Sequence, residues 1–372
     1  MKFSIIVPVY NRPNEVDELL ESLTLQSMMD FEVIVVEDGS KITCKDVCEK
    51  YADILDLHYF VKPNSGPGQS RNYGAERAQG EWLIILDSDV VLPEGYLKAV
   101  NEELEMRNEK LECINEKCQQ QDNEQPHSSF LIPHFSFDAY GGPDASHPSF
   151  TPVQKAISYS MTSFFTTGGI RGSSPQLGGT RGALDKFFPR SFNMGIRRDV
   201  YLQLGGFSKM RFGEDIDFSY RIVEAGYKTA LLPDAWVWHK RRTDFRKFFR
   251  QVFNSGIARI NLEKRHPGTM KLVHLLPMVF TVGVITLSLI ALVLTFYSLV
   301  AAAVALSPLL LYSLLLCIDS SVQNRNLWVG ILSVPAAFVQ LTGYGLGFIK
   351  AWWKRMVLKQ DEFTAFEKNF YQ

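Results

Sequence analysis

Asp87 and Asp89, two carboxylates separated by one residue, follow the apolar run Trp82–Leu86. Such a pair, placed just after a buried strand, can hold a divalent cation and a ribose together. Mg²⁺ in particular takes few protein carboxylates and completes its shell with the phosphate oxygens of a substrate. Solvated loop acids have the same local pattern, so the pair alone is a weak indication. Its meaning depends on whether the preceding run is a strand that ends at a sheet edge.

Two further segments carry side chains that suit a nucleotide. Asp38 follows the apolar run Phe31–Val36 and precedes Gly39, where it could also be an ordinary turn residue. The glycine-rich segment Asn64–Asn72 opens a predicted helix, so its backbone amides and Arg71 could meet a diphosphate. A plain loop explains this segment equally well.

These residues need a scaffold that brings strand ends together. Continuous β-rich runs occur at Phe3–Val9, Phe31–Val36, Leu57–Val61 and Trp82–Leu86. Between the first two runs, apolar residues recur at helical spacing. This alternation of strands with helices predicts right-handed βαβ crossovers and a doubly wound α/β sheet. Ligands bind such sheets at the carboxyl ends of the strands, which is where both acidic clusters lie.

Four ordered motifs resemble the family 2 glycosyltransferases, over a stretch from the N-terminus to about residue 245. They are Val7-Pro8-Val9-Tyr10-Asn11, Val36-Glu37-Asp38-Gly39-Ser40, Gly66-Pro67-Gly68 with Arg71-Asn72, and Leu86-Asp87-Ser88-Asp89. The resemblance implies a GT-A fold, which is a Rossmann-like mixed sheet. It also implies a nucleotide-diphospho-sugar donor, a UDP- or GDP-sugar, and inversion of the anomeric centre.

The resemblance further implies roles for single residues of the donor side. Asp38 would bind the nucleobase, Arg71 would support the nucleotide and Asp87 would contact the ribose. Asp89 would coordinate the Mg²⁺ or Mn²⁺ that bridges the diphosphate. The residues expected to bind the nucleotide-sugar are Pro8, Tyr10, Asp38, Arg71 and Asp87.

The second half of the resembling stretch supplies the expected catalytic base. Glu214 and Asp215 begin a helix, and such acids could simply favour the positive end of the helix dipole. In the family this pair holds the base at the position of Asp215, with Glu214 on the acceptor side. A sugar hydroxyl needs a base of this kind because it is a poor nucleophile. His239 resembles a family histidine near the diphosphate, either a metal ligand or a structural residue, and Asn193 and Met194 would line the acceptor cleft.

The implied function is metal-dependent single displacement of a sugar onto a hydroxyl of a saccharide or lipid-linked acceptor, in cell-surface glycan biosynthesis. The Gln-x-x-Arg-Trp motif of processive synthases is missing after Asp215. A processive polysaccharide synthase is therefore the weaker alternative, and a non-catalytic membrane scaffold is disfavoured by the intact aspartates. The sugar, the nucleotide, the acceptor, the linkage and the pathway stay open.

Residues 272–318 contain no Asp, Glu, Lys or Arg, and neither do residues 326–349. The first stretch is too long for one membrane helix, so we expect spans at about 273–296 and 299–318. The second predicts a helix at about 327–349, which either crosses the membrane or lies within it as a re-entrant or interfacial segment. Before the first of these stretches, residues 240–250 are basic and aromatic, which suits an amphipathic helix on anionic lipid or a solvated helix face.

Basic residues flank the apolar region on both sides and attract both ends to the cytoplasm. They are Arg250, Arg259, Lys264, Arg265 and Lys271 before it, and Lys350, Lys354, Arg355 and Lys359 after it. Three full crossings cannot satisfy both ends, so either the last segment does not cross or the large N-terminal domain overrules the charges of the tail. The only apolar run near the N-terminus is too short for a signal peptide. We therefore expect a multi-pass protein of the inner membrane with a cytoplasmic catalytic domain.

Composition bounds these expectations. The chain has 372 residues, and its 39 basic and 40 acidic side chains give a net charge of −1. A nucleic-acid polymer is thus an unexpected partner, because proteins that bind one usually carry a basic excess. The expected divisions are a catalytic domain at 1–245, a basic amphipathic segment at 246–271, a membrane region at 272–350 and a polar tail at 351–372.

Overall fold

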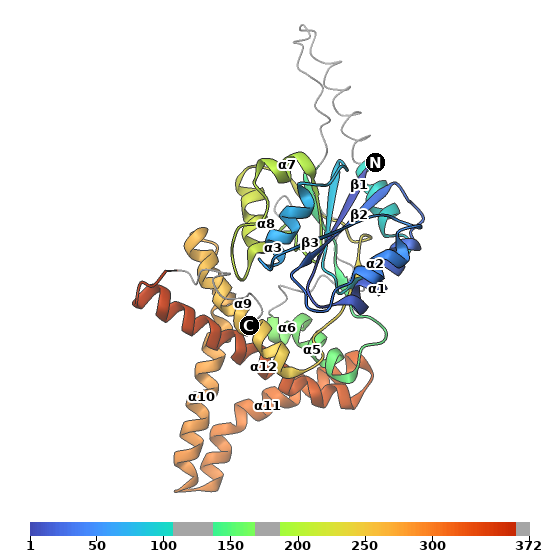
Figure 1. Cartoon of the computed structure of the whole chain (residues 1–372). Coiled ribbons are helices and arrows are strands. Elements are labelled where there is room, and N and C mark those ends of the chain that lie inside the picture. Colours follow the sequence, from blue (N-terminus) through green and yellow to red (C-terminus); the bar gives the residue numbers. More distant parts are fainter. Residues whose placement is uncertain (107–136, 168–186, 362–372) are drawn as a thin grey trace, which may run out of the picture. The chain divides into compact units, whose positions relative to one another are not determined.

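The computed structural model describes residues 1–106, 137–167 and 187–361 (Figure 1). The chain forms two compact units. Unit 1 comprises the described residues of Met1–Ala145 and Ser173–His239, and unit 2 comprises those of Ser146–Gly172 and Lys240–Thr364. The four expected divisions stay a prediction, and the end of the expected tail lies outside the described residues.

A seven-stranded mixed sheet forms the centre of unit 1, in the order β3-β2-β1-β4-β8-β6-β9. The strands β1, β2, β3 and β4 are parallel, while β8 is antiparallel to both β4 and β6. Their bounds are β1 Phe3–Val9, β2 Phe31–Asp38, β3 Asp56–Lys62, β4 Trp82–Leu86, β6 Ala139–Gly141, β8 Asn193–Arg197 and β9 Thr229–Leu231. The expected Rossmann-like mixed sheet is confirmed.

Alternate residues of the central strands face opposite sides of the sheet. Ile5 and Val7 of β1 belong to one buried cluster, together with Leu19 of α1, whereas Ile6 belongs to another with Phe218 of α8. Both clusters are fully apolar, so both faces of the sheet are covered. The covering helices are α1 Pro13–Thr24 and α2 Lys45–Tyr51 on one face, and α3 Pro67–Ala75, α7 Arg198–Gln203 and α8 Glu214–Glu224 on the other (Figure 1).

A small three-stranded sheet has the order β5-β10-β7, and its strand β5 follows shortly after β4 in the sequence. Its strands are β5 Val90–Val91, β7 Asp144–Ala145 and β10 Val237–His239. The antiparallel pairing of β10 with β5 places His239 opposite Val90, the residue after Asp89. This pairing brings together two parts of the chain that the sequence separates widely.

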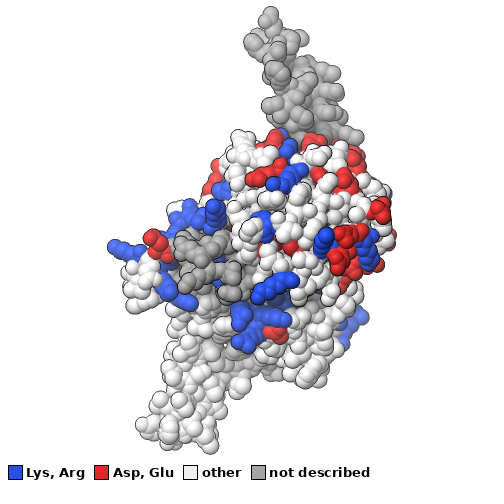
Figure 2. Space-filling model, viewed as in Figure 1, with Lys and Arg blue, Asp and Glu red and all other residues white. Residues whose placement is uncertain are grey.

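Unit 2 is helical, and three of its helices are long and apolar enough to cross a membrane. These candidate spans are Leu272–Thr295, Leu299–Asn324 and Leu327–Val357, and they overlap the three expected segments, although the second and third helices run further. Figure 2 shows a hairpin of α10 and α11 free of charged side chains over most of its length. The helices are α5 Pro152–Thr162, α6 Phe164–Thr167, α9 Phe245–Arg265, α10 Leu276–Thr295, α11 Leu299–Asn324 and α12 Leu327–Trp352, with short turns η2 Leu272–His274 and η3 Trp353–Val357.

Gly195 of β8 provides a test of the sheet packing. A Cβ on this residue would lie 1.9 Å from the ring of Tyr140, which is fully buried. We expect Gly195→Ala to lower the free energy of unfolding by roughly 1–3 kcal/mol, because the ring has no room to move. Gly95→Ala is the control, since a Cβ there meets nothing within 4 Å. Equal melting temperatures of the two purified variants would contradict this packing.

Candidate active site

Asp87, Asp89 and His239 form one cluster at the carboxyl end of β4. One ligand atom from each lies within 4.8 Å of the other two. Asp89 is buried, with 8% of its surface exposed, and its Oδ1 lies 3.4 Å from His239 Nε2. The structure therefore brings together the two expected metal ligands and the expected ribose contact.

The donor set of this cluster fits Mg²⁺ or Mn²⁺. Two carboxylates and one imidazole are hard or borderline ligands, which both cations accept. The ring of His239 stacks on Phe192 at a centroid distance of 5.0 Å, and its Nδ1 lies 3.8 Å from Asp144 Oδ2. These neighbours orient the imidazole so that Nε2 faces Asp89, as outer partners commonly do for a metal ligand.

Arg12 is a site residue that sequence reasoning missed. It precedes α1, at the carboxyl end of β1, and its Nη1 forms an ion pair with Asp89 Oδ2. This pairing balances part of the negative charge of the aspartate cluster. A basic residue just past the first strand, at the same edge as Asp38 and Asp87, was the available signal.

Arg71 links the cation cluster to the second pair of acids. Its side chain is buried, and Nη2 donates to Asp87 Oδ1 at 2.7 Å. Its Nη1 lies 3.4 Å from Glu214 Oε1, at the start of α8. The guanidinium also lies over the ring of Phe207 at 5.0 Å. Arg71 thus joins residues that are far apart in the sequence into one polar network.

Glu214 and Asp215 have opposite electrostatic environments. Burial, and then the neighbouring Asp215, raise the pKa of Glu214 to about 7. Burial also acts to raise the pKa of Asp215, but the Arg190 guanidinium outweighs it and the pKa lies below its usual value. Arg190 Nε donates to Asp215 Oδ2 at 2.7 Å. Adjacent carboxylates with pKa values pushed apart are suited to different roles in proton transfer.

Asp38 organises the glycine-rich turn. The amides of Ser65 and Gly66 donate to its two carboxylate oxygens at 2.9 and 2.8 Å, and Lys62 forms an ion pair with it. The carboxylate is thereby held at the entrance of α3. This contact is with the glycine-rich turn and not with the Asp38-Gly39 turn, and binding of the nucleobase stays a prediction.

The remaining expected residues lie in two places. Pro8 is buried in β1 opposite Val36, and Tyr10 follows the strand at the same edge as Asp38. Asn193 and Met194 are both fully buried in β8. Asn193 accepts from Tyr96 Oη at 2.6 Å and donates to the carbonyl of Ala235 at 2.8 Å. These contacts are internal to the fold, and contact with an acceptor stays a prediction for both residues.

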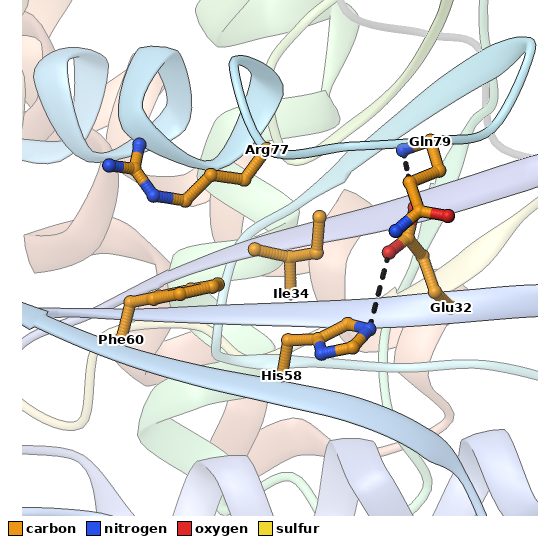
Figure 3. Close-up of a pocket in the computed structure, with 6 residues that line it drawn as sticks. All are labelled: Glu32, Ile34, His58, Phe60, Arg77 and Gln79. Atoms are coloured by element: carbon orange, nitrogen blue, oxygen red, sulfur yellow. Dashed lines mark hydrogen bonds and ion pairs between the residues drawn. The ribbon is translucent and has the colours of Figure 1, made fainter.

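A cavity of about 250 Å³ lies elsewhere in unit 1, at the opposite end of β2 from Asp38. In Figure 3 the side chain of Glu32 points toward His58, and their closest atoms are 3.5 Å apart. The backbone amide of Gln79 donates to the Glu32 carboxylate at 2.6 Å. The lining residues are Glu32, Ile34, His58, Phe60, Arg77 and Gln79. This cavity is separate from the aspartate cluster, because it lies at the amino ends of the strands.

Two family models match the chain in succession. Residues 4–154 match glycosyl transferase family 2, and residues 187–318 match glycosyl transferase family group 2. The chain is 41% identical over 102 residues to poly(ribitol-phosphate) beta-N-acetylglucosaminyltransferase TarS of Staphylococcus aureus, which is 26% of this chain and 18% of that protein. It is 46% identical over 86 residues to an uncharacterized glycosyltransferase of Haemophilus influenzae, 23% of this chain and 29% of that protein. The chain thus spans less than a third of either relative.

A solved structure resembles this chain over most of its length. The mannosyltransferase PcManGT from Pyrobaculum calidifontis, determined with GDP-Man and Mn²⁺, superposes with a TM-score of 0.58 over 95% of this chain and 88% of that one. At 16% sequence identity this likeness concerns the fold alone. The expected GT-A fold is therefore confirmed. On the two family models that match it, the chain belongs to the family 2 glycosyltransferases.

Proposed function

We propose that this chain is an inverting, divalent-metal-dependent glycosyltransferase. It would move a sugar from a nucleotide-diphospho-sugar to a hydroxyl of a saccharide or lipid-linked acceptor, in cell-surface glycan biosynthesis. The observation that carries the proposal is the network in which Arg71 joins Asp87 to Glu214, with Asp89 and His239 on one side and Asp215 on the other. One edge of the sheet thereby holds a candidate cation site and a candidate base.

Asp215 is the proposed catalytic base. Its lowered pKa keeps it ionised at neutral pH, so it can accept the proton of the acceptor hydroxyl as the oxygen attacks the anomeric carbon. The bond to the donor diphosphate breaks in the same displacement, which inverts the configuration. Arg190 positions the Asp215 carboxylate through its hydrogen bond.

Asp87, Asp89 and His239 would hold the cation. When bound, Mg²⁺ or Mn²⁺ supplies positive charge beside the departing diphosphate. Arg71 would keep the Asp87 carboxylate in position, and Pro8, Tyr10 and Asp38 lie along the same edge, where the nucleoside would bind. Support for the donor class comes from PcManGT, whose structure contains GDP-Man and Mn²⁺, and from the N-acetylglucosaminyltransferase TarS.

The proposed location is the inner membrane, with the catalytic unit in the cytoplasm. Three candidate spans and the basic residues that precede them support this location. A lipid-linked acceptor suits an enzyme whose anchor lies in the same bilayer.

A donor panel tests the function directly. Membranes containing the full chain are incubated with UDP- and GDP-sugars, in Mg²⁺, in Mn²⁺ and in EDTA, and lipid-extracted products are analysed by mass. We expect transfer from one donor class with either cation and none in EDTA. Undiminished transfer in EDTA would refute the metal role, and no transfer from any donor would refute the function.

Arg190→Gln is expected to shift the pH profile of transfer. Arg190 lowers the pKa of Asp215, so its removal raises that pKa, and a higher pH is then needed to ionise the base. The acidic limb of kcat/KM against pH should move to higher pH. Arg77→Gln, at an exposed arginine paired with Glu76, is the matched control. An unmoved acidic limb would show that Arg190 does not act through Asp215.

A further inference from the structure

The helix α12 is the least regular of the three candidate spans, and its surroundings differ from those of α10 and α11. In its most apolar stretch, 44% of the residues are buried within the structure, against 11% in the corresponding stretch of each of the other two helices. Its main neighbours within unit 2 are α9, α11, α5 and α10. A membrane helix that faces lipid on several sides would look like α10 or α11 instead.

The helix α9 lies alongside the second half of α12 in the same direction. A Cβ on Gly256 would lie 2.1 Å from the carbonyl oxygen of Tyr344, and one on Gly347 would lie 2.0 Å from that of Phe253. The two backbones therefore touch where both helices have glycine. About two turns further on, Lys264 Nζ donates to the carbonyl of Arg355 at 3.2 Å.

The helix α9 is too polar to lie in the hydrocarbon. Exposed basic residues occur at both of its ends: Arg246, Lys247, Arg250, Lys264 and Arg265. Each charge costs several kcal/mol at the centre of a bilayer. One face of α9 is apolar and packs against α5 and α12, while its exposed surface carries the basic residues, so the helix suits the level of anionic headgroups. The part of α12 that runs beside α9 must then lie at a similar depth.

The helix α12 also crosses the base of the α10–α11 hairpin instead of running beside it (Figure 1). The helix α12 contacts the first turns of α10. There Thr281 Oγ1 donates to the carbonyl of Leu341, and the rings of Phe280 and Phe338 lie 5.4 Å apart. It meets α11 near its end, where Ser320 and Ser333 share a hydrogen bond of 2.7 Å.

The exposed part of the hairpin lies beyond these contacts. Ile285, Leu289 and Leu292 of α10 are each about half exposed or more. Because α10 has 20 residues, it is about 30 Å long, the thickness of the hydrocarbon core. Thr281, where α12 contacts α10, lies within the first ~9 Å along α10. Interfacial helices are buried to a similar depth below the membrane surface.

We propose that α10 and α11 cross the bilayer as a hairpin, while α12 lies in the boundary between headgroups and acyl chains beside α9. The tail after α12 then returns to the side from which α10 enters. This arrangement places the basic residues before α10 and after α12 on one side, which three full crossings cannot do. It rests on the membrane location proposed above but is independent of the transferase activity.

The occupant of the exposed face of α12 would be anionic lipid. Trp328, Ile331 and Leu346 are exposed along the helix, and Trp352 and Trp353 are exposed beside Lys350 and Lys354 at its end. Tryptophan favours the headgroup level, and lysine beside it attracts anionic headgroups. The apolar side chains would contact the upper part of the acyl chains.

Epitope accessibility in the full-length chain tests the arrangement. Three variants carry one tag each: at the N-terminus, between Tyr297 and Ser298, and after Lys359. In sealed spheroplasts of the host we expect an antibody to detect only the tag at 297–298. After permeabilisation it should detect all three. Detection of the tag after Lys359 in sealed spheroplasts would overturn the proposal, because it would require a third crossing.

A second measurement guards against a tag that disturbs folding. In sealed inverted vesicles, trypsin should cleave the untagged chain after Lys354, Arg355 or Lys359, as judged by the mass of the fragments. Protection of these sites until detergent is added would also overturn the proposal. If the tag at 297–298 stays hidden in sealed spheroplasts, the hairpin itself does not cross, and the membrane location fails with it.

Discussion

Asp215→Asn should lower the rate of sugar transfer by roughly 10²- to 10⁴-fold, the usual contribution of a positioned general base. Asparagine keeps the shape of the side chain but cannot accept the proton of the acceptor hydroxyl. Binding of the nucleotide-sugar should change little, since the closest charged partner of Asp215 is Arg190 and not a cation-cluster residue. Single-turnover transfer and donor binding by calorimetry measure the two effects separately. Asp199→Asn, at an exposed acid of α7, is the control.

Glu214→Gln decides between the two neighbouring acids. A pKa of about 7 would make Glu214 a reasonable base at neutral pH, although about half of the molecules would carry it protonated. If Asp215 is the base, Glu214→Gln should keep most of the transfer rate, with a loss that follows from weaker positioning of Arg71. Near-complete loss in Glu214→Gln, together with normal chemistry in Asp215→Asn, would move the base to Glu214.

The strand ends of the sheet were predictable from sequence, and with them the edge where the site forms. Continuous apolar runs rich in β-branched residues, such as Ile5–Val9, identify buried parallel strands, and in this fold class ligands bind at the carboxyl ends of those strands. Asp38 and Asp87 are therefore placed by a rule that needs only local pattern. The positions of Asp89 and His239 relative to one another came from the resemblance, and the β5–β10 pairing then explains them.

The ion pairs of the site were not predictable, because they join side chains far apart in the chain. Arg71 and Glu214 lie on α3 and α8, and no local pattern relates them. The same holds for Arg12 with Asp89. The burial of Asn193 and Met194 has another cause. Their strand lies antiparallel between β4 and β6 inside the sheet, and the two apolar clusters cover its faces, which a short mixed run of residues does not reveal.

The helical unit shows where hydropathy is informative and where it misleads. The apolar run ends at Asp319, but α11 continues to Asn324, since the Asp319 carboxylate accepts a hydrogen bond of 2.6 Å from Tyr159 Oη. The helix α12 has a lower mean hydropathy than α10 and α11, and its glycines make it look like a weak membrane span. In the structure Gly343 and Gly347 are the places where α9 approaches closely, so they reflect helix packing and not a weak helix.

Asp89→Asn should weaken binding of the cation and lower the transfer rate at least 10²-fold. Asparagine offers a neutral oxygen in place of a carboxylate, at a buried position next to His239. The loss corresponds to about 2.7 kcal/mol of transition-state stabilisation. Titration with Mn²⁺, followed by its paramagnetic resonance signal, reports binding without any turnover. Asp46→Asn, at an exposed acid of α2, should leave both quantities unchanged.

Arg12→Gln should have the opposite effect on cation binding, because the Arg12 guanidinium and a cation compete for the Asp89 carboxylate. Without nucleotide we expect this variant to bind Mn²⁺ more tightly than the unaltered chain, and the double variant with Asp89→Asn to bind it as weakly as Asp89→Asn alone. Additive effects of the two substitutions would mean that Arg12 acts elsewhere. Unchanged Mn²⁺ affinity in Asp89→Asn would remove Asp89 from the cation site and leave its partner Arg12 with a structural role.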